Sequence, residues 1–291
     1  MKIGFMPDDH QIRFQTMRAL ALTAEEAGFE SFWLADHLIF RFPGQKEEGI
    51  WEVFTVLSAL AASTSRIKIA PMVACTSFRN PALLAKIADA MDEVSDGRFI
   101  LGLGAGWHQP EYDAFGYPFD HLAGRFEEAL QVIVPLLREG HVDFTGKYVQ
   151  ARDAKLIPRG PSPSGPQILI GAKRPRMLGL VAKYADAWNT AWHLTPEAVT
   201  TRYADLLTAC NETGRDPATL TLTAGTQAHI LAAGETPDPE TKAIWGTVEE
   251  VTQAFRGFAA VGVKHLIVMV PGATPEQVAR FAPVVAALAD A

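Results

Sequence analysis

Few residues in this sequence point to a protein held together by disulfides or metal ions. Among 291 residues there are two cysteines, Cys75 and Cys210, and their spacing matches neither a CxxC pair nor a zinc site. The zinc-binding motif HExxH is absent. The sequence therefore predicts neither a disulfide framework nor a bound metal.

Positive charge and long apolar runs are also scarce. The net charge of −7 argues against a nucleic-acid partner and against a broadly basic membrane-binding surface. No apolar run approaches the roughly 18 residues of a membrane span, and the acidic residue Asp8 comes too early for a signal peptide. We expect a cytoplasmic protein that binds neither nucleic acid nor membrane.

What the sequence does contain is a regular alternation of short apolar segments and longer helical patterns. This alternation is typical of repeated strand–helix units, and segments without a polar face indicate strands buried on both sides of a parallel sheet. The length suits one α/β barrel of about 250 residues with insertions. The predicted fold class is α/β, a single (β/α)₈ TIM barrel that forms one domain over residues 1–291. The eight predicted strands are Lys2–Pro7, Ser31–Asp36, Ile67–Val73, Phe99–Gly104, Gln167–Gly171, Ala187–Ala191, Leu220–Thr226 and Leu266–Val270.

Helix ends carry their own sequence signals. Thr247 and Glu250 have the spacing of a capping box, and Thr195 and Thr274 each precede a proline at a first helical position, where their side chains should cap. Glycine is expected just after a helix, because it adopts the left-handed backbone there at little cost. The glycines at such positions are Gly28, Gly214 and Gly262.

Three long segments follow predicted strands, at roughly 37–50, 105–122 and 227–246. In a barrel such loops gather at the carboxyl ends of the strands, where active sites lie, and their length is typical of functional lids. The proline-rich stretch Pro158–Pro166 follows a helical pattern. We therefore place it at the opposite end, as a connection.

Asp36 and His37 close the second predicted strand, at the rim where barrel enzymes keep acids and bases. In the structural alternative, Asp36 caps a turn and His37 bonds the backbone. The rim location favours a catalytic pair. Trp192 and His193, beyond the sixth strand, and His10, after the first, are candidates for a substrate pocket.

Three alternate glycines, Gly102, Gly104 and Gly106, mark the end of the fourth predicted strand. They allow backbone to approach a flat or phosphorylated ligand closely, although glycines also relieve crowding within a barrel. The pattern is GxGxG followed by Trp107, whereas the dinucleotide fingerprint requires GxGxxG opening a helix directly. A Rossmann site is therefore not indicated.

Three cations, Lys173, Arg174 and Arg176, follow Gly171-Ala172 at the start of a helical pattern. Cations at a helix N-terminus oppose the macrodipole unless an anion binds there. The sequence therefore predicts a phosphate site, with a solvated basic patch as the alternative.

Taken together, these motifs resemble those of the bacterial-luciferase-like oxidoreductases. The likeness is strong from Met1 to about His193. The sequence most resembles the branch that uses the deazaflavin coenzyme F420, although other relatives use FMN. The resemblance rests on Asp36-His37, Thr64–Ile67, Arg79–Lys86, Gly97-Arg98, Gly102–Trp107 and Tyr184–Asn189.

The resemblance implies where such a cofactor would bind. Asp36 and His37 match a ring-side acidic and histidine pair, in which His37 donates a proton or orients the substrate. Trp107 stands where some F420 enzymes carry a catalytic glutamate, so that acid–base scheme is not carried over. The residues implied to bind the cofactor are Met72 and Val73, at a non-proline cis peptide that backs the ring, Gly104, Ala105, Gly106 and Trp107 beside it, and Gly171, Ala172, Lys173 and Arg174 at its phosphate.

The function implied is hydride transfer between F420 and a small organic substrate. The first alternative is an FMN-dependent monooxygenase served by a separate flavin reductase, and the second is a non-catalytic flavin-binding protein. A phosphate-handling aldolase or isomerase would need a lysine or paired carboxylates at strand ends, whereas Lys2, Lys68 and Lys264 lie at strand starts or within strands. The resemblance also implies a homodimer.

Overall fold

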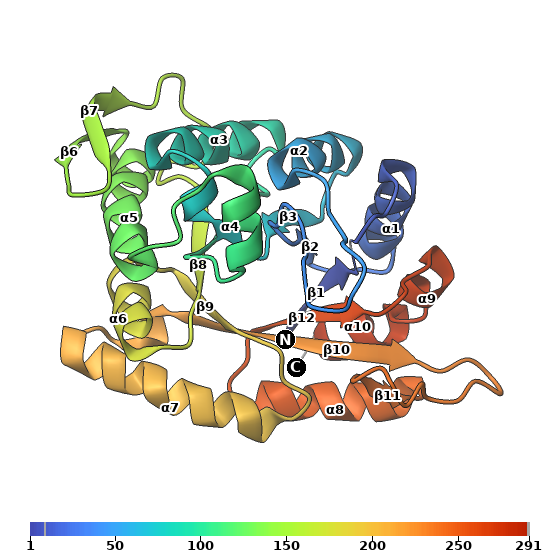
Figure 1. Ribbon diagram of the computed structural model, residues 1–291. Helices are drawn as coiled ribbons and strands as arrows, with labels where there is room; N and C mark the ends of the chain where they lie inside the picture. The colour runs from blue at the N-terminus through green and yellow to red at the C-terminus, as the bar shows by residue number, and fades with distance from the viewer. Residues whose placement is uncertain (9, 290–291) are drawn as a thin grey trace. The chain divides into compact units, whose positions relative to one another are not determined.

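The computed structural model describes residues 1–8 and 10–289 (Figure 1). The chain forms two compact units, the first made of Met1–Trp33 with Ala172–Ala291 and the second of Leu34–Gly171. Among the described residues, no helix is both long and apolar enough to cross a membrane.

The first unit is built on parallel strands in the order β2-β1-β12-β10-β9. β1 (Lys2–Pro7) pairs along its whole length with β12 (His265–Val270), from Lys2 opposite His265 to Pro7 opposite Val270. Every residue of β1 after Lys2 is buried, as expected of a parallel strand covered on both faces. The other strands are β2 (Ser31–Leu34), β9 (Ala187–Thr190), β10 (Thr221–Ile230) and the short β11 (Ile244–Gly246), which pairs with β10.

The helices of the first unit begin and end largely where local signals predict. The capping boxes form at Thr247 and Thr274, and Gly28, Gly214 and Gly262 all have positive φ. The prediction for Thr195 is wrong, because this residue precedes the helix but its side chain makes no capping hydrogen bond. The helices are α1 (Phe14–Glu26), α6 (Pro175–Tyr184), α7 (Pro196–Thr213), η2 (Pro217–Thr219), α8 (Val248–Ala260), α9 (Pro275–Ala279) and α10 (Ala282–Ala289), with α7 and α8 along one side of β10 (Figure 1).

The second unit contains the parallel strands β8 (Gln167–Gly171), β5 (Ile100–Gly104) and β4 (Ala74–Cys75), paired in that order. β3 (Lys68–Pro71) meets the start of β5 through a parallel bridge between Ile69 and Phe99. The predicted strand 67–73 is interrupted, since β3 ends at Pro71 and the chain resumes as β4 at Ala74. The peptide bond between Met72 and Val73 is cis. The helices are α2 (Val53–Ser63), η1 (Thr76–Phe78), α3 (Pro81–Val94), α4 (Gln109–Phe115) and α5 (Leu122–Glu139).

One hairpin was not predicted, and two segments expected to be loops contain regular structure. The antiparallel hairpin of β6 (His141–Thr145) and β7 (Gln150–Lys155) follows α5 and precedes the proline-rich stretch. Its strands are mostly exposed, so they lack the apolar run on which strand prediction depends. The segment 105–122 contains α4, and the segment 227–246 begins inside β10 and ends in β11.

Candidate functional site

His37 follows β2 and bonds a buried carboxylate. Its Nδ1 lies 2.9 Å from Oε1 and 3.2 Å from Oε2 of Glu111, which lies in the first turn of α4 and also accepts a 2.8 Å bond from the backbone N–H of Leu38. A carboxylate only accepts, so we assign the imidazole proton to Nδ1. The neutral ring then presents Nε2 as a proton acceptor. The Glu111 side chain is 1% exposed and that of His37 is 16% exposed, so solvent reaches the histidine alone.

Asp36 is held in an ion pair. Arg79 donates to its two oxygens at 2.6 and 3.0 Å, and the backbone N–H of Cys75 donates at 2.8 Å. Arg79 also donates to Glu52 at 2.6 Å. Burial acts to lower the arginine pKa, but the hydrogen bonds and charges of the two carboxylates outweigh it and raise the pKa of Arg79. Asp36 therefore presents no unoccupied oxygen for proton transfer.

The alternate glycines of the second unit make room for protein atoms. A Cβ added at Gly102 would overlap the carbonyl oxygen of Pro71, and one added at Gly104 would lie 2.6 Å from a methyl carbon of Val73. At Gly106, whose φ is +81°, it would overlap the hydroxyl of Tyr112. Relief of crowding thus accounts for these glycines. The cis peptide bond that the resemblance implies between Met72 and Val73 is present in the structure.

The segment after β5 places Trp107 and His108 near His37. Trp107 is 59% exposed, whereas His108 is buried and its Nε2 accepts a 3.1 Å bond from the backbone N–H of Arg41. Burial lowers the pKa of His108, more than the opposing charge of Glu111 raises it. The neutral imidazole therefore links the segment after β5 to the segment that contains Arg41.

Cys75 is not a nucleophile in this arrangement. Its sulfur lies 3.0 Å from the hydroxyl of Tyr112, which donates to the carbonyl of Ala105. Burial raises the pKa of Cys75 to about 11, so the thiol stays protonated.

In the first unit, the N-terminus of α6 is surrounded by cations. Lys173, Arg174 and Arg176 are exposed, and the side chain of the N-cap residue Arg174 makes no capping hydrogen bond. A helix N-terminus without a cap from its N-cap residue, together with this positive charge, suits an anion. The backbone of Ala172 is largely used within the unit, since its N–H lies 3.4 Å from the carbonyl oxygen of Asn189 and its carbonyl accepts from the Trp188 indole at 3.0 Å.

The predicted pocket residues of the first unit fall into two places. Trp192 and His193 follow β9 across a cis Ala191-Trp192 bond, and the Nε2 of His193 lies 2.8 Å from the Thr190 hydroxyl. Burial, and then the charge of Lys173, lowers the pKa of His193. His10 follows β1, with its Nδ1 3.9 Å from a carboxylate oxygen of Asp8.

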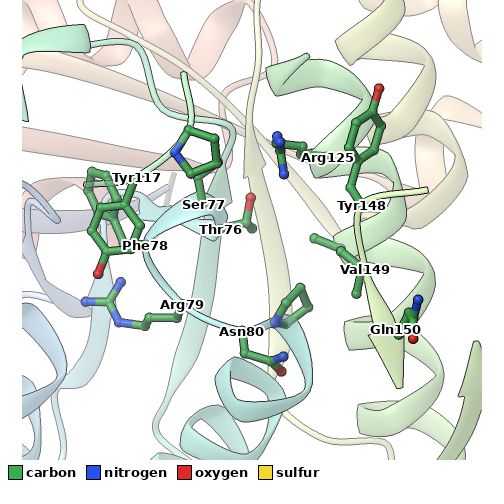
Figure 2. A pocket seen from close by; sticks show the side chains of 13 residues that line it. Thr76, Ser77, Phe78, Arg79, Asn80, Tyr117, Arg125, Tyr148, Val149 and Gln150 are labelled. Atoms are coloured by element: carbon green, nitrogen blue, oxygen red, sulfur yellow. The ribbon is translucent and has the colours of Figure 1, made fainter. Parts of the chain in front are cut away.

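A separate cavity of about 300 Å³ lies in the second unit (Figure 2). Its lining includes Arg79 and Arg125, but neither His37 nor Glu111. Both guanidinium groups already pair with carboxylates, Arg79 as described and Arg125 with Asp120 at 2.7 Å. Both cations of the lining are therefore compensated, and Arg79 links the cavity lining to Asp36.

Two residues of this arrangement, Glu111 and Arg79, were not predicted from the sequence. Arg79 lies in one of the motifs that carry the family resemblance, where it had no predicted role, and Glu111 follows Pro110 in an unpredicted helix start. Within residues 1–8 and 10–289, no group of three or more histidine, cysteine or acidic side chains is placed to hold a metal ion.

Comparison with known proteins places this geometry in a family context. A sequence model described as Luciferase-like monooxygenase matches residues 1–238. The chain is 35% identical over 223 residues to a pyrimidine monooxygenase RutA of Agrobacterium fabrum, covering 72% of this chain and 59% of that protein. It is 33% identical over 245 residues to the protein of that name from Enterobacter cloacae, covering 80% and 63%. The chain thus spans about three-fifths of the length of these curated relatives.

Solved structures show the same fold. An F420-dependent secondary alcohol dehydrogenase in complex with an F420-acetone adduct superposes with a TM-score of 0.82 and 19% identity, over 99% of this chain and 98% of that one. The monooxygenase RslO1 from Streptomyces bottropensis gives 0.80 and 20%, over 99% and 98%. At these identities the likeness concerns the fold alone, and it confirms the predicted TIM-barrel class.

Proposed function

The chain belongs to the luciferase-like monooxygenase family, and from this premise we propose that it is an oxidoreductase that transfers a hydride between coenzyme F420 and a small organic alcohol or carbonyl compound. The observation that carries the proposal is the His37–Glu111 pair. Moving a hydride to or from a carbon that bears oxygen requires a partner for the proton on that oxygen.

His37 has the geometry of that partner. When bound, F420 supplies a ring carbon that gives or takes a hydride. In alcohol oxidation, Nε2 of His37 accepts the hydroxyl proton as the carbonyl forms, and in the reverse direction it returns the proton to the carbonyl oxygen. Glu111, bonded to Nδ1 at 2.9 Å, fixes the tautomer and stabilises the imidazolium. Asp36 acts by position, because its pairing with Arg79 and the Cys75 N–H anchors the residue that precedes His37.

Several residues would hold the cofactor. Its phosphate suits the cationic N-terminus of α6 at Lys173 and Arg174. Met72 and Val73 would back the ring, as the resemblance implies. Gly104–Trp107 are predicted to lie beside the cofactor ring. Gly171 and Ala172 are predicted to contact its phosphate through their backbone.

Cofactor binding tests the proposal directly. F420 and FMN are titrated separately into the purified protein and followed by cofactor fluorescence and calorimetry. We expect F420 to bind, and His37→Ala to retain that affinity while losing most turnover. Phe115→Ala, which removes an exposed aromatic ring at the end of α4, is the matched control and should behave as wild type. Tight binding of FMN with none of F420 would overturn the proposal.

A second candidate is an FMN-dependent monooxygenase supplied with reduced flavin by a separate reductase. It is favoured by the curated relatives, which are named pyrimidine monooxygenase and share 32–36% identity. Oxygen consumption in the presence of reduced FMN and a pyrimidine such as uracil identifies this activity. A flavin-binding protein without catalysis would bind cofactor and turn over with neither system. The expected homodimer is tested by light scattering of the purified protein.

A further inference from the structure

The loop segments beside His37 bring together four aromatic rings, Phe40, Phe42, Trp107 and His108, which we call the aromatic wall. Phe40 and Phe42 stack at 6.1 Å with 14° between planes, and Phe42 and Trp107 stack at 6.5 Å with 23°. The ring of His37 lies 4.3 Å from that of Phe40 and 5.5 Å from that of Trp107. The candidate acid–base group therefore borders a nearly continuous aromatic surface.

Two of the four rings of the aromatic wall are exposed to solvent. Phe42 is 40% and Trp107 is 59% exposed, whereas Phe40 and His108 are buried. Single exposed apolar residues are common, but large rings clustered in contact and left to solvent mark a binding surface. The exposed rings of Phe42 and Trp107 add little to the free energy of folding, because apolar surface stabilises a fold only when it is buried.

The wall is also held in place. Phe40 forms an antiparallel bridge with Glu48, which folds segment 38–48 back on itself. The N–H of Arg41 bonds Nε2 of His108, whose ring lies 5.0 Å from that of Phe42. Two segments distant in sequence are thus fixed in one arrangement, so the rings are positioned before any ligand arrives.

Two charged groups beside the wall, Glu111 and Arg41, already have partners. Glu111 accepts bonds from His37 and the Leu38 N–H, and the guanidinium of Arg41 lies 2.8 Å from a Glu47 carboxylate oxygen. Burial keeps His108 neutral by lowering its pKa. A charged substrate would lose hydration and would have to compete with these existing pairs, whereas a flat apolar ring gains stacking area.

We infer that the aromatic wall binds the flat face of an uncharged, conjugated substrate that presents a carbonyl or hydroxyl oxygen to His37. The inference rests on the proposed function, because it specifies the substrate class for the same site. It limits that class to ring compounds without a carboxylate, phosphate or ammonium group.

Three probes of similar size test the inference by calorimetry with the cofactor-loaded protein, without need of turnover. They are 2-acetylnaphthalene, its anionic counterpart 2-naphthoate, and the saturated ketone 2-acetyldecahydronaphthalene. We expect 2-acetylnaphthalene to bind about tenfold or more tightly than 2-naphthoate. The saturated ketone should also bind more weakly, because it cannot stack.

Variants show whether the wall is responsible. Phe42→Ala and Trp107→Ala should each weaken 2-acetylnaphthalene about three- to tenfold, as expected for one lost ring contact. Phe115→Ala removes an equally exposed ring outside the wall and should leave affinity unchanged. Equal affinity for the neutral and anionic probes, or full affinity in Trp107→Ala, would overturn the inference. Probe binding without hydride transfer would instead reject the proposed function and leave the inference standing.

Discussion

Arg79 and Asp36 form a two-point ion pair, with 2.6 and 3.0 Å between guanidinium nitrogens and carboxylate oxygens, in which the Asp36 side chain is 1% and the Arg79 side chain 11% exposed. The pair joins the segment after β2 to the loop before α3. It thereby fixes the residue next to His37 from a point 43 positions further along the chain.

Removing one partner of this pair should be costly. Arg79→Ala leaves the Asp36 carboxylate buried without its counter-ion, so we expect the free energy of unfolding to fall by about 3–5 kcal/mol. Adding Asp36→Asn removes the stranded charge and should recover part of the loss. Urea denaturation of the single and double variants measures both effects. A loss below about 1 kcal/mol in Arg79→Ala would show that the pair contributes no more than a surface salt bridge.

Glu111→Gln should impair turnover more than binding. The glutamine amide can donate where the carboxylate only accepts, so the tautomer with a bare Nε2 at His37 is no longer favoured. We expect kcat to fall about 100-fold, with cofactor affinity and KM near wild type. Nitrogen chemical shifts of the His37 ring report the tautomer directly. An unchanged tautomer with normal kcat would remove Glu111 from the mechanism.

His108 predicts a pH dependence of stability. Burial lowers its pKa in the folded protein, so the unfolded chain takes up this proton first as pH falls. The stabilising Arg41–His108 bond is therefore fully effective above the unfolded histidine pKa of about 6.5 and is lost progressively as pH falls toward the lowered folded value. Denaturant titrations of His108→Gln should show a shallower loss between pH 7 and 5 than wild type. His141→Gln, at an exposed position in the hairpin, should keep the wild-type slope.

Two glycines should respond oppositely to alanine. In Gly102→Ala the new methyl group overlaps the Pro71 carbonyl oxygen, and backbone cannot move aside cheaply, so we expect destabilisation of about 2–3 kcal/mol or more. Gly179, within α6, has open space at the corresponding position among the described residues, and Gly179→Ala should stabilise by about 0.5–1 kcal/mol because alanine favours helix. Thermal unfolding of both variants makes the comparison. A tolerated Gly102→Ala would show that this packing is adjustable.

Much of the framework was predictable because its signals are local. The capping boxes at Thr247 and Thr274 and the helix-ending glycines act over three or four residues, so sequence spacing contains the whole interaction. Strand positions followed from burial on both faces. The β6–β7 hairpin escaped because its strands are exposed and carry no such pattern.

The sequence by itself determined the barrel class, several helix ends and the placing of His37 and Trp107 after strands, since each depends on periodicity or on neighbours in the chain. Only the tertiary structure decided that His37 bonds Glu111 and that Asp36 is fully engaged by Arg79, because these partners lie 74 and 43 positions away. It also showed that the alternate glycines accommodate Pro71, Val73 and Tyr112. The sequence shows that these positions are glycines and so lack a side chain. Which atoms occupy the space beside them depends on which segments the fold packs together.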